Sequence, residues 1–394
     1  MSGERVGGPL PIFTAKGVRV FVSGLLSVAL PFYLRVIGYG PLFQGIALVA
    51  ILAGNAVSNV AVTYLDWVAG RRRLLQAFSL LMVAAGAVLA LNTSPIPILV
   101  ACFVGNISST GTEAGPFQSI EAGTLPELAQ SGSTVKVFGR YNLIGYSAAA
   151  VGQLAAAGPG LLGNSLAAFR GVFLAFSLAG ALLFVVYSRI QGIERGRSTK
   201  PGLGHLGAQA RKDLVRLSGL FSVDAFGGVF VTTYLLSIWF NSTYGLQLVL
   251  LGPIFFVAAV ISAASTYGAA LIAVRLGNLR TMVYTHLLSS ALLVLLGLAG
   301  SLFLALAFLF LRQSFSQMDV PTRQALMSEM FQSQERVQAY AVTNTMRSAG
   351  SAFAGPVAAG ILGLGLVSAV PFAGGGTKIV YDLMTFFSFR KRYR

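Results

Sequence analysis

Charged residues are scarce in this chain. Asp, Glu, Lys and Arg make up 10% of its 394 residues, whereas a soluble domain of this length carries about 25%. Apolar residues make up 55%, and the mean hydropathy is +0.75. This composition argues against a soluble domain and is typical of a membrane protein.

Cysteine and histidine are nearly absent. The single Cys102 can form no internal disulfide, so cysteine usage says nothing about the redox compartment. Neither His205 nor His286 has Cys, Asp or Glu at metal-ligand spacing, and we expect both to be solvated or interfacial. The sequence also contains no glycine-rich phosphate loop that ends in Gly-Lys-Ser/Thr. It therefore predicts no enzyme activity, catalytic residue, metal site or cofactor.

Acidic residues are few relative to basic ones. The chain has 12 Asp and Glu against 28 Lys and Arg, a net charge of +16. Such a charge can indicate a nucleic-acid partner, but the basic residues are scattered over many short joints instead of lining one face. We therefore predict no nucleic-acid partner.

Long apolar stretches dominate the sequence. A hydrocarbon layer of about 30 Å requires roughly 20 apolar residues per helix. Twelve stretches approach that length and predict an all-α integral membrane protein with twelve transmembrane helices. They cover residues 18–38, 42–65, 74–92, 96–120, 140–162, 169–190, 214–240, 245–272, 281–300, 302–328, 338–363 and 366–386.

Basic and neutral joints alternate between these stretches. Cytoplasmic loops retain Lys and Arg, so the basic joints are predicted to lie inside. Arg35 and Arg170 are exceptions near outer helix ends. The alternation predicts a multi-pass protein of the cell membrane with both termini in the cytoplasm. The basic joints contain Arg71–Arg73, Lys136 with Arg140, residues 189–216, Arg275 with Arg280, Arg336 and Arg390–Arg394.

The halves of the chain look like diverged copies. Glu113-Ala-Gly-Pro-Phe-Gln118 matches Asp319-Val-Pro-Thr-Arg-Gln324 at an offset of 206 (113 to 319). The joints at Gly70 and Gly277 match at an offset of 207 (70 to 277). We predict one six-helix bundle over residues 1–190, a cytoplasmic linker over 191–212 and a second bundle over 213–394.

The joint after the second stretch has a recognisable pattern. Asp66-Trp-Val-Ala-Gly70 is followed by Arg71, Arg72 and Arg73, and resembles the Asp-x-x-x-Gly-Arg loop signature of the major facilitator superfamily. A degraded copy at the corresponding joint keeps Gly277 and Arg280 and lacks the acid. Glycine permits a tight reversal between helices, and the arginines hold the loop at the cytoplasmic surface. The competing interpretation is an ordinary basic loop.

The resemblance implies a fold and a mechanism. It implies two pseudo-symmetric six-helix bundles that rock around a central site, and a monomer that moves a small-molecule substrate. The loop of Asp66 and Gly70, with its copy at Gly277, then gates the conformational change. Gly158-Pro159-Gly160 and Gly355-Pro356 look like the Gly-Pro element of superfamily antiporters, which points to export.

Five ionisable residues remain as candidates within the membrane after the loop charges are removed. Each costs about 2.5–3.5 kcal/mol at the bilayer centre, so such residues mark candidate sites. In the functional interpretation the acids exchange protons, and the arginines hold an anionic substrate or a gate. In the structural interpretation Arg312 or Arg347 neutralises Asp319. The five residues are Glu113, Asp224, Arg312, Asp319 and Arg347.

Polar residues near these charges extend the predicted pathway. Gln118 and Asn344 are candidates to hydrogen-bond a substrate, or else join neighbouring helices. Glu121, Arg323 and Glu329 are expected at the interface in cytoplasmic gate salt bridges. Lys378 and Asp382 are four residues apart and can pair near the inner membrane face.

The sequence thus predicts a secondary active transporter that works by alternating access, is coupled to protons and exports its substrate. Its partners would be a small molecule, protons and the lipid bilayer. The alternatives are a membrane sensor of the same fold that does not transport, and a facilitative uniporter.

Overall fold

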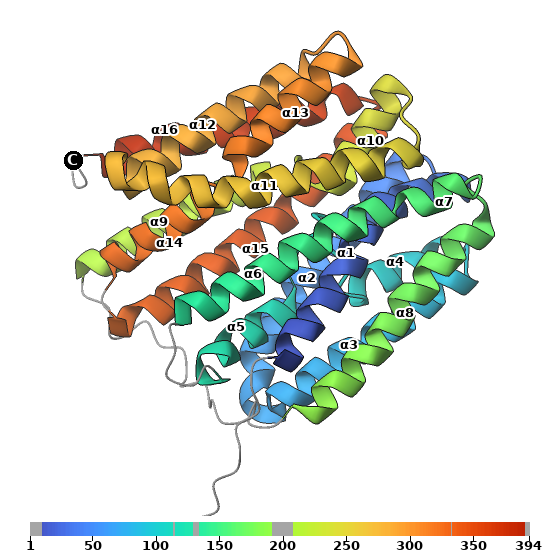
Figure 1. The fold of residues 1–394 in the computed structure, drawn as a ribbon, viewed down its shortest axis with the longest axis horizontal. Helices are drawn as coiled ribbons and strands as arrows, with labels where there is room; N and C mark the ends of the chain where they lie inside the picture. Colours follow the sequence, from blue (N-terminus) through green and yellow to red (C-terminus); the bar gives the residue numbers. More distant parts are fainter. Residues whose placement is uncertain (1–9, 113–114, 129–133, 191–207, 332, 391–394) are drawn as a thin grey trace, which may run out of the picture. The chain divides into compact units, whose positions relative to one another are not determined.

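The fold was analysed in a computed structural model, which describes residues 10–112, 115–128, 134–190, 208–331 and 333–390. Within these ranges the chain is helical and contains no β-strand (Figure 1). This confirms the predicted all-α class. The α-helices are α1 (Leu10–Val36), α2 (Pro41–Ala69), α3 (Arg71–Leu91), α4 (Pro95–Val104), α5 (Pro116–Leu128), α6 (Thr134–Ala155), α7 (Ala157–Leu161), α8 (Leu166–Arg189), α9 (Ala208–Val229), α10 (Thr233–Tyr244), α11 (Leu248–Leu276), α12 (Asn278–Gly297), α13 (Leu302–Ser316), α14 (Asp319–Met330), α15 (Ser333–Gly363) and α16 (Val370–Phe389).

Seven described helical spans are long and apolar enough to cross a membrane. Many large apolar side chains on the described helices are exposed, whereas several charged side chains, such as Arg19, Glu121 and Asp224, are buried. Phe303, Phe353 and Leu178 are more than two-thirds exposed at 80%, 74% and 70%. A water-soluble protein would avoid such a surface, so it indicates contact with lipid. The seven spans are Leu10–Val36, Pro41–Val62, Arg71–Leu91, Leu166–Arg189, Ala208–Tyr244, Leu248–Ser265 and Asn278–Gly297.

Each of the twelve predicted stretches contains one helix or a pair of consecutive helices. The first helix begins at Leu10, eight residues before the predicted start at 18. Four stretches are interrupted, at α4/α5, α6/α7, α9/α10 and α13/α14. The expectation of one continuous helix over 96–120 was therefore wrong. Gly111, which has φ 74°, and Pro116 explain the break, since glycine adopts positive φ easily and proline removes a backbone donor.

The chain divides into two compact units. Unit 1 comprises residues 1–199 with 247–256, and unit 2 comprises 200–246 with 257–394. In unit 1, α1 packs against α6 and α3 packs against α8. In unit 2, α9 packs against α15 and α12 packs against α16. Counted as predicted stretches, both units therefore pair their first helix with their fifth and their third with their sixth.

Glycines allow the first-with-fifth pairing in both units. A Cβ at Gly24 of α1 would collide with the backbone of Ala149 on α6. A Cβ at Gly350 of α15 would collide with the backbone of Ser222 on α9. Small residues of this kind permit helix backbones in a membrane to approach closely.

The two glycine joints also have the same backbone geometry. Gly70 precedes α3 with φ 80° and ψ 148°, and Gly277 precedes α12 with φ 78° and ψ 162°. This region of the backbone map is accessible almost exclusively to glycine. Two joints matched from sequence are thus matched in conformation, which supports the internal repeat.

Candidate functional site

Unit 1 contains a buried ion pair. The Arg19 guanidinium on α1 contacts the Glu121 carboxylate on α5 through two bonds, of 2.6 and 3.0 Å. The side chains of Arg19 and Glu121 are 3% and 0% exposed. The hydroxyls of Tyr187 on α8 and Tyr141 on α6 donate to the same carboxylate at 2.6 and 2.7 Å. Four helices are joined at this carboxylate.

Aromatic rings enclose this pair further. The Arg19 guanidinium lies 4.8 Å from the centroid of the Phe117 ring, and the Lys16 ammonium lies 4.3 Å from that of Tyr141. The expectation of an interfacial gate at Glu121 was wrong, because this side chain is fully buried. Arg19 was not recognised from sequence, because the stretch predicted over 18–38 placed it one residue from the helix end, whereas α1 begins at Leu10.

Unit 1 also contains a polar, non-helical segment over residues 105–112, between α4 and α5. Its Ser108 and Ser109 are buried, and the Ile107 carbonyl accepts a hydrogen bond of 2.8 Å from Asn55 on α2. Ser108 and Thr110 both donate to the Thr112 carbonyl. Non-helical backbone within membrane helices persists where protein buries it or where it lines a polar site.

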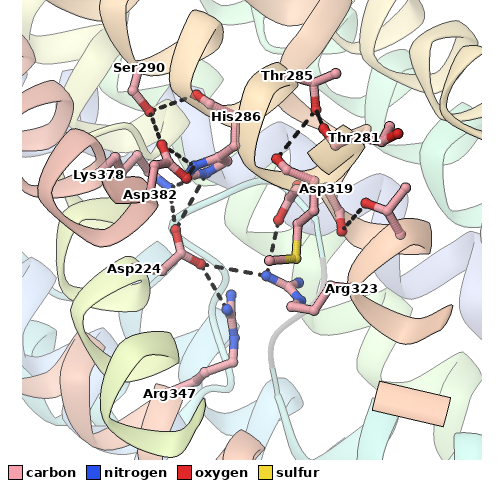
Figure 2. A network of polar contacts seen from close by, with 12 residues as sticks. Asp224, Thr281, Thr285, His286, Ser290, Asp319, Arg323, Arg347, Lys378 and Asp382 are labelled. Carbon is pink, nitrogen blue, oxygen red and sulfur yellow. Dashed lines mark hydrogen bonds and ion pairs between the residues drawn. The ribbon is translucent and has the colours of Figure 1, made fainter. Parts of the chain in front are cut away.

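Unit 2 contains a larger network, centred on Asp224 of α9 (Figure 2). The Asp224 carboxylate lies 2.7 Å from Lys378 on α16 and 2.8 Å from Arg347 on α15. It also lies 3.5 Å from His286 on α12 and 3.6 Å from Arg323 on α14. One carboxylate therefore meets basic groups from four other helices.

The two arginines that contact Asp224 are partly exposed. The Arg347 side chain is 30% exposed and that of Arg323 is 15% exposed, whereas Asp224 is 4% exposed. Arg323 also pairs with Asp319 at 3.0 Å on its own helix. The expectation that Arg312 or Arg347 neutralises Asp319 was wrong, because Arg323 does so and Arg347 pairs with Asp224.

His286 connects Asp224 to a second carboxylate in this network. Its Nδ1 lies 2.8 and 2.9 Å from the two Asp382 oxygens, and Ser290 donates to Asp382 at 3.4 Å. Its Nε2 lies 3.3 Å from the Lys378 ammonium. The expectation of a solvated or interfacial His286 was wrong, since it is 4% exposed. Lys378 and Asp382 were expected to pair with each other, but Lys378 contacts Asp224 and Asp382 contacts His286.

Arg312 of α13 has a different environment. It is 7% exposed, and its Nη1 donates to Gln313 at 3.2 Å. The structure gives it no ion pair with any described residue, and its buried Nε has no hydrogen-bond partner. Arg312 thus stands apart from the network around Asp224.

The remaining predicted residues are dispersed. Gln118 is half-buried on α5, and Asn344 is exposed on α15. Arg71–Arg73 begin α3, where Arg72 donates to the Ser188 carbonyl, and Arg280 is exposed on α12. Glu113 and the side chains of Asp66 and Glu329 lie outside the described part of the structure.

The sequence identified some residues of the Asp224 network as candidates, but it did not predict which of them contact one another. Asp224 and Arg347 were identified as charges within apolar stretches. Their association, and the contribution of Lys378, depend on helix packing across 154 residues of sequence. In this arrangement one carboxylate is shared among several cations, and one of its partners is a histidine, the side-chain type that can change charge near neutral pH.

Comparisons with known proteins identify the family. Residues 12–355 match the sequence model described as Major Facilitator Superfamily. An uncharacterized membrane protein of Saccharomyces cerevisiae is 24% identical over 387 residues, covering 88% of this chain and 85% of its own.

Solved structures agree at the level of the fold. The D-xylose-proton symporter aligns with a TM-score of 0.73 and 15% identity over 96% of this chain and 98% of its own. The nucleoside transporter NupG aligns with a TM-score of 0.73 and 12% identity over 98% and 99%. A bacterial homologue of the iron transporter ferroportin aligns with a TM-score of 0.69 and 13% identity over 97% and 100%. On the family match, with the fold in agreement, this multi-pass integral membrane protein belongs to the major facilitator superfamily of transporters.

Proposed function

We propose that this protein is a secondary transporter that moves a small solute by alternating access and couples the movement to protons. The observation that carries the proposal is the sharing of Asp224 among Lys378, Arg347, His286 and Arg323. A buried charge is expensive in a membrane protein and marks a functional site by default. A carboxylate with several alternative partners can exchange them as the helices move.

His286 is the proposed proton site within this network. Asp224 faces three permanent cations, so its negative charge is strongly favoured and it makes a poor proton carrier. Histidine is the side chain that most readily changes charge near neutral pH. The 3.3 Å contact between the Lys378 ammonium and His286 Nε2 fits a neutral ring, which accepts there and donates from Nδ1 to Asp382.

A proton on His286 would change the pairing of Asp224. The protonated ring has a donor at both nitrogens and can no longer accept from Lys378. Two positive groups 3.3 Å apart repel, and the Asp224 oxygen 3.5 Å from Nε2 is the available acceptor. Protonation would therefore move Lys378 away from Asp224 and weaken the ion pair that joins α16 to α9. This links one proton to a rearrangement of helices.

Several parts of the sequence prediction belong to the same proposal. They are the two six-helix bundles joined by residues 191–212, cytoplasmic termini in the cell membrane, a monomeric state and export of the substrate. The basic joints support the topology, and the Gly-Pro elements support export. Asp66 remains the proposed gating acid of the loop, with Gly70 and Gly277 as its hinges.

Transport in proteoliposomes tests the proposal. The wild-type protein should exchange a labelled solute between equal concentrations and should accumulate or expel it when a pH difference is imposed. His286→Gln should keep exchange, which needs no net proton movement, and should lose the pH-driven component. Absence of counterflow for every solute in a broad panel would favour the sensor interpretation instead.

The second histidine supplies the matched control. His205→Gln makes the same chemical change in the predicted linker, at a position outside the described residues, and we expect it to retain pH-driven transport. If His286→Gln also retains it, the proton site is not His286. Exchange without any pH-driven component in the wild type would instead favour a facilitative uniporter.

A further inference from the structure

The buried guanidinium of Arg312 has no counterion among the residues that the structure describes. Arg312 is the eleventh residue of α13, about 15 Å along the helix from its start and thus near the middle of a 30 Å hydrocarbon layer. A guanidinium carries five N–H donors. Arg312 uses one of them on Gln313, and its Nε has no partner among the described residues. A charge in this position requires a compensating anion or a strong polar environment.

The nearest polar groups do not supply an anion. The Gln313 amide oxygen accepts from Arg312 at 3.2 Å, from Ser262 of α11 at 3.2 Å and from Ser316 at 2.6 Å. Three donors already converge on that single neutral oxygen. Ser262 and Ser316 are themselves buried, at 8% and 7% exposed. The surroundings of Arg312 are therefore rich in donors and short of negative charge.

Other features of α13 do not remove the need for an anion. Arg312 is four residues before the end of the helix, where the dipole favours a cation, but that end carries roughly half a unit charge spread over its carbonyls. Every acid of the Asp224 network is paired elsewhere: Asp224 with Lys378 and Arg347, and Asp319 with Arg323. Neither source compensates the whole charge of Arg312.

We infer that Arg312 binds the anionic group of the transported solute, a carboxylate or a phosphate. The planar guanidinium matches either group through two parallel hydrogen bonds. Ser262, Ser316 and Gln313 form one hydrogen-bonded cluster with Arg312, and we propose that they contact the same ligand. The mid-helix depth favours a solute over a lipid headgroup. The assignment of this anion as substrate depends on the proposed transport function, whereas the anion site itself does not.

Thermal unfolding of the purified full-length protein tests the site without requiring transport. The protein is placed in phosphatidylcholine nanodiscs at constant ionic strength, and the probes are acetate, succinate and inorganic phosphate, with acetamide and succinamide as uncharged counterparts. At least one oxyanion should raise the melting temperature by about 2 °C or more, because a ligand of the folded state stabilises it. The amides should have no effect.

Two variants locate the effect. Arg312→Gln should abolish the oxyanion shift, and without any anion it should melt higher than the wild type, because the uncompensated charge has gone. Arg170→Gln removes an exposed arginine from the outer end of α8 and should keep the full shift. No oxyanion shift in the wild type, a shift retained in Arg312→Gln, or a lower melting temperature for ligand-free Arg312→Gln would each overturn the inference.

The same assay separates the other outcomes. If nanodiscs that contain phosphatidylglycerol reproduce an Arg312-dependent shift while the soluble probes do not, the anion is a lipid headgroup and the substrate assignment falls. If the Arg312-dependent shift holds but proteoliposomes transport no solute, the anion site stands and the proposed function fails. If solutes are transported but no oxyanion raises the melting temperature, the proposed function stands and the anion site fails.

Discussion

The buried charges of unit 1 and unit 2 are arranged differently. In unit 1, Glu121 meets a single arginine, and two tyrosine hydroxyls complete its hydrogen bonds. In unit 2, Asp224 meets four basic groups, one of which, Arg347, is 30% exposed. The first arrangement is closed, since both charges are fully paired and buried. The arrangement in unit 2 is open to rearrangement, since four basic groups share the one carboxylate of Asp224.

The difference indicates how the two halves of one repeat diverged in role. Both units pair their helices in the same way, and both have the same glycine joint. The closed pair in unit 1 joins four helices and fixes their packing. The carboxylate of Asp224 in unit 2 has several basic groups within reach, and a switching element requires alternative pairings of this kind. We therefore propose a structural role for the Arg19–Glu121 pair and a transport role for the Asp224 network.

The largest predicted effect comes from breaking the closed pair. Glu121→Gln leaves Arg19 buried without its counterion, which typically costs about 3–5 kcal/mol. The melting temperature should fall by at least about 6 °C. The double variant Arg19→Met/Glu121→Leu should recover much of this loss, because both charges of the pair are removed together. An unchanged melting temperature in Glu121→Gln would mean that this pair does not stabilise unit 1.

The glycine joints should respond equally in the two units. Gly70→Ala and Gly277→Ala each force alanine into a backbone region that costs about 1–3 kcal/mol, while the added methyl group meets open space. Chemical denaturation of the two variants should give matching losses of stability. Gly40→Ala, also in open space but without positive φ, should have little effect. Unequal losses at Gly70 and Gly277 would weaken the structural equivalence of the joints.

The smallest stability effect is expected at the exposed edge of the open network. Arg347→Gln removes a partly exposed partner of Asp224, which keeps its contacts with Lys378 and His286. Exposed ion pairs contribute about 0–1 kcal/mol, so the melting temperature should change little. The exchange rate in proteoliposomes should nevertheless fall. A large loss of stability with normal exchange per folded molecule would assign Arg347 a structural role like that of Arg19.

Much of this architecture could be predicted from sequence. Apolar length and the basic joints identify the helical membrane fold, and the spacing of Gly70 and Gly277 reveals the repeated joint. Charges at Asp224, Arg312 and Arg347 stand out because their stretches are otherwise apolar. These signals are local, so a single sequence carries them.

The pairing of the charges could not be predicted in the same way. Asp224 and Lys378 are separated by 154 residues, and their contact depends on how α9 and α16 pack. Arg19 was missed because apolar length alone placed the helix start too late. His286 was misplaced because a histidine near a stretch boundary resembles an interfacial residue. Its burial depends on Asp382, which α16 brings to it.

The most direct test compares Asp224→Asn with Glu121→Gln in two assays on the same preparations. Solute exchange is measured per correctly folded molecule in proteoliposomes, and the melting temperature is measured in detergent. We predict that Asp224→Asn is destabilised, because buried Lys378 loses its carboxylate, and that its folded fraction does not exchange solute. Glu121→Gln should also be strongly destabilised, but its folded fraction should still exchange solute. Normal exchange in Asp224→Asn, with loss of exchange in folded Glu121→Gln, would reverse the assigned roles and contradict the account.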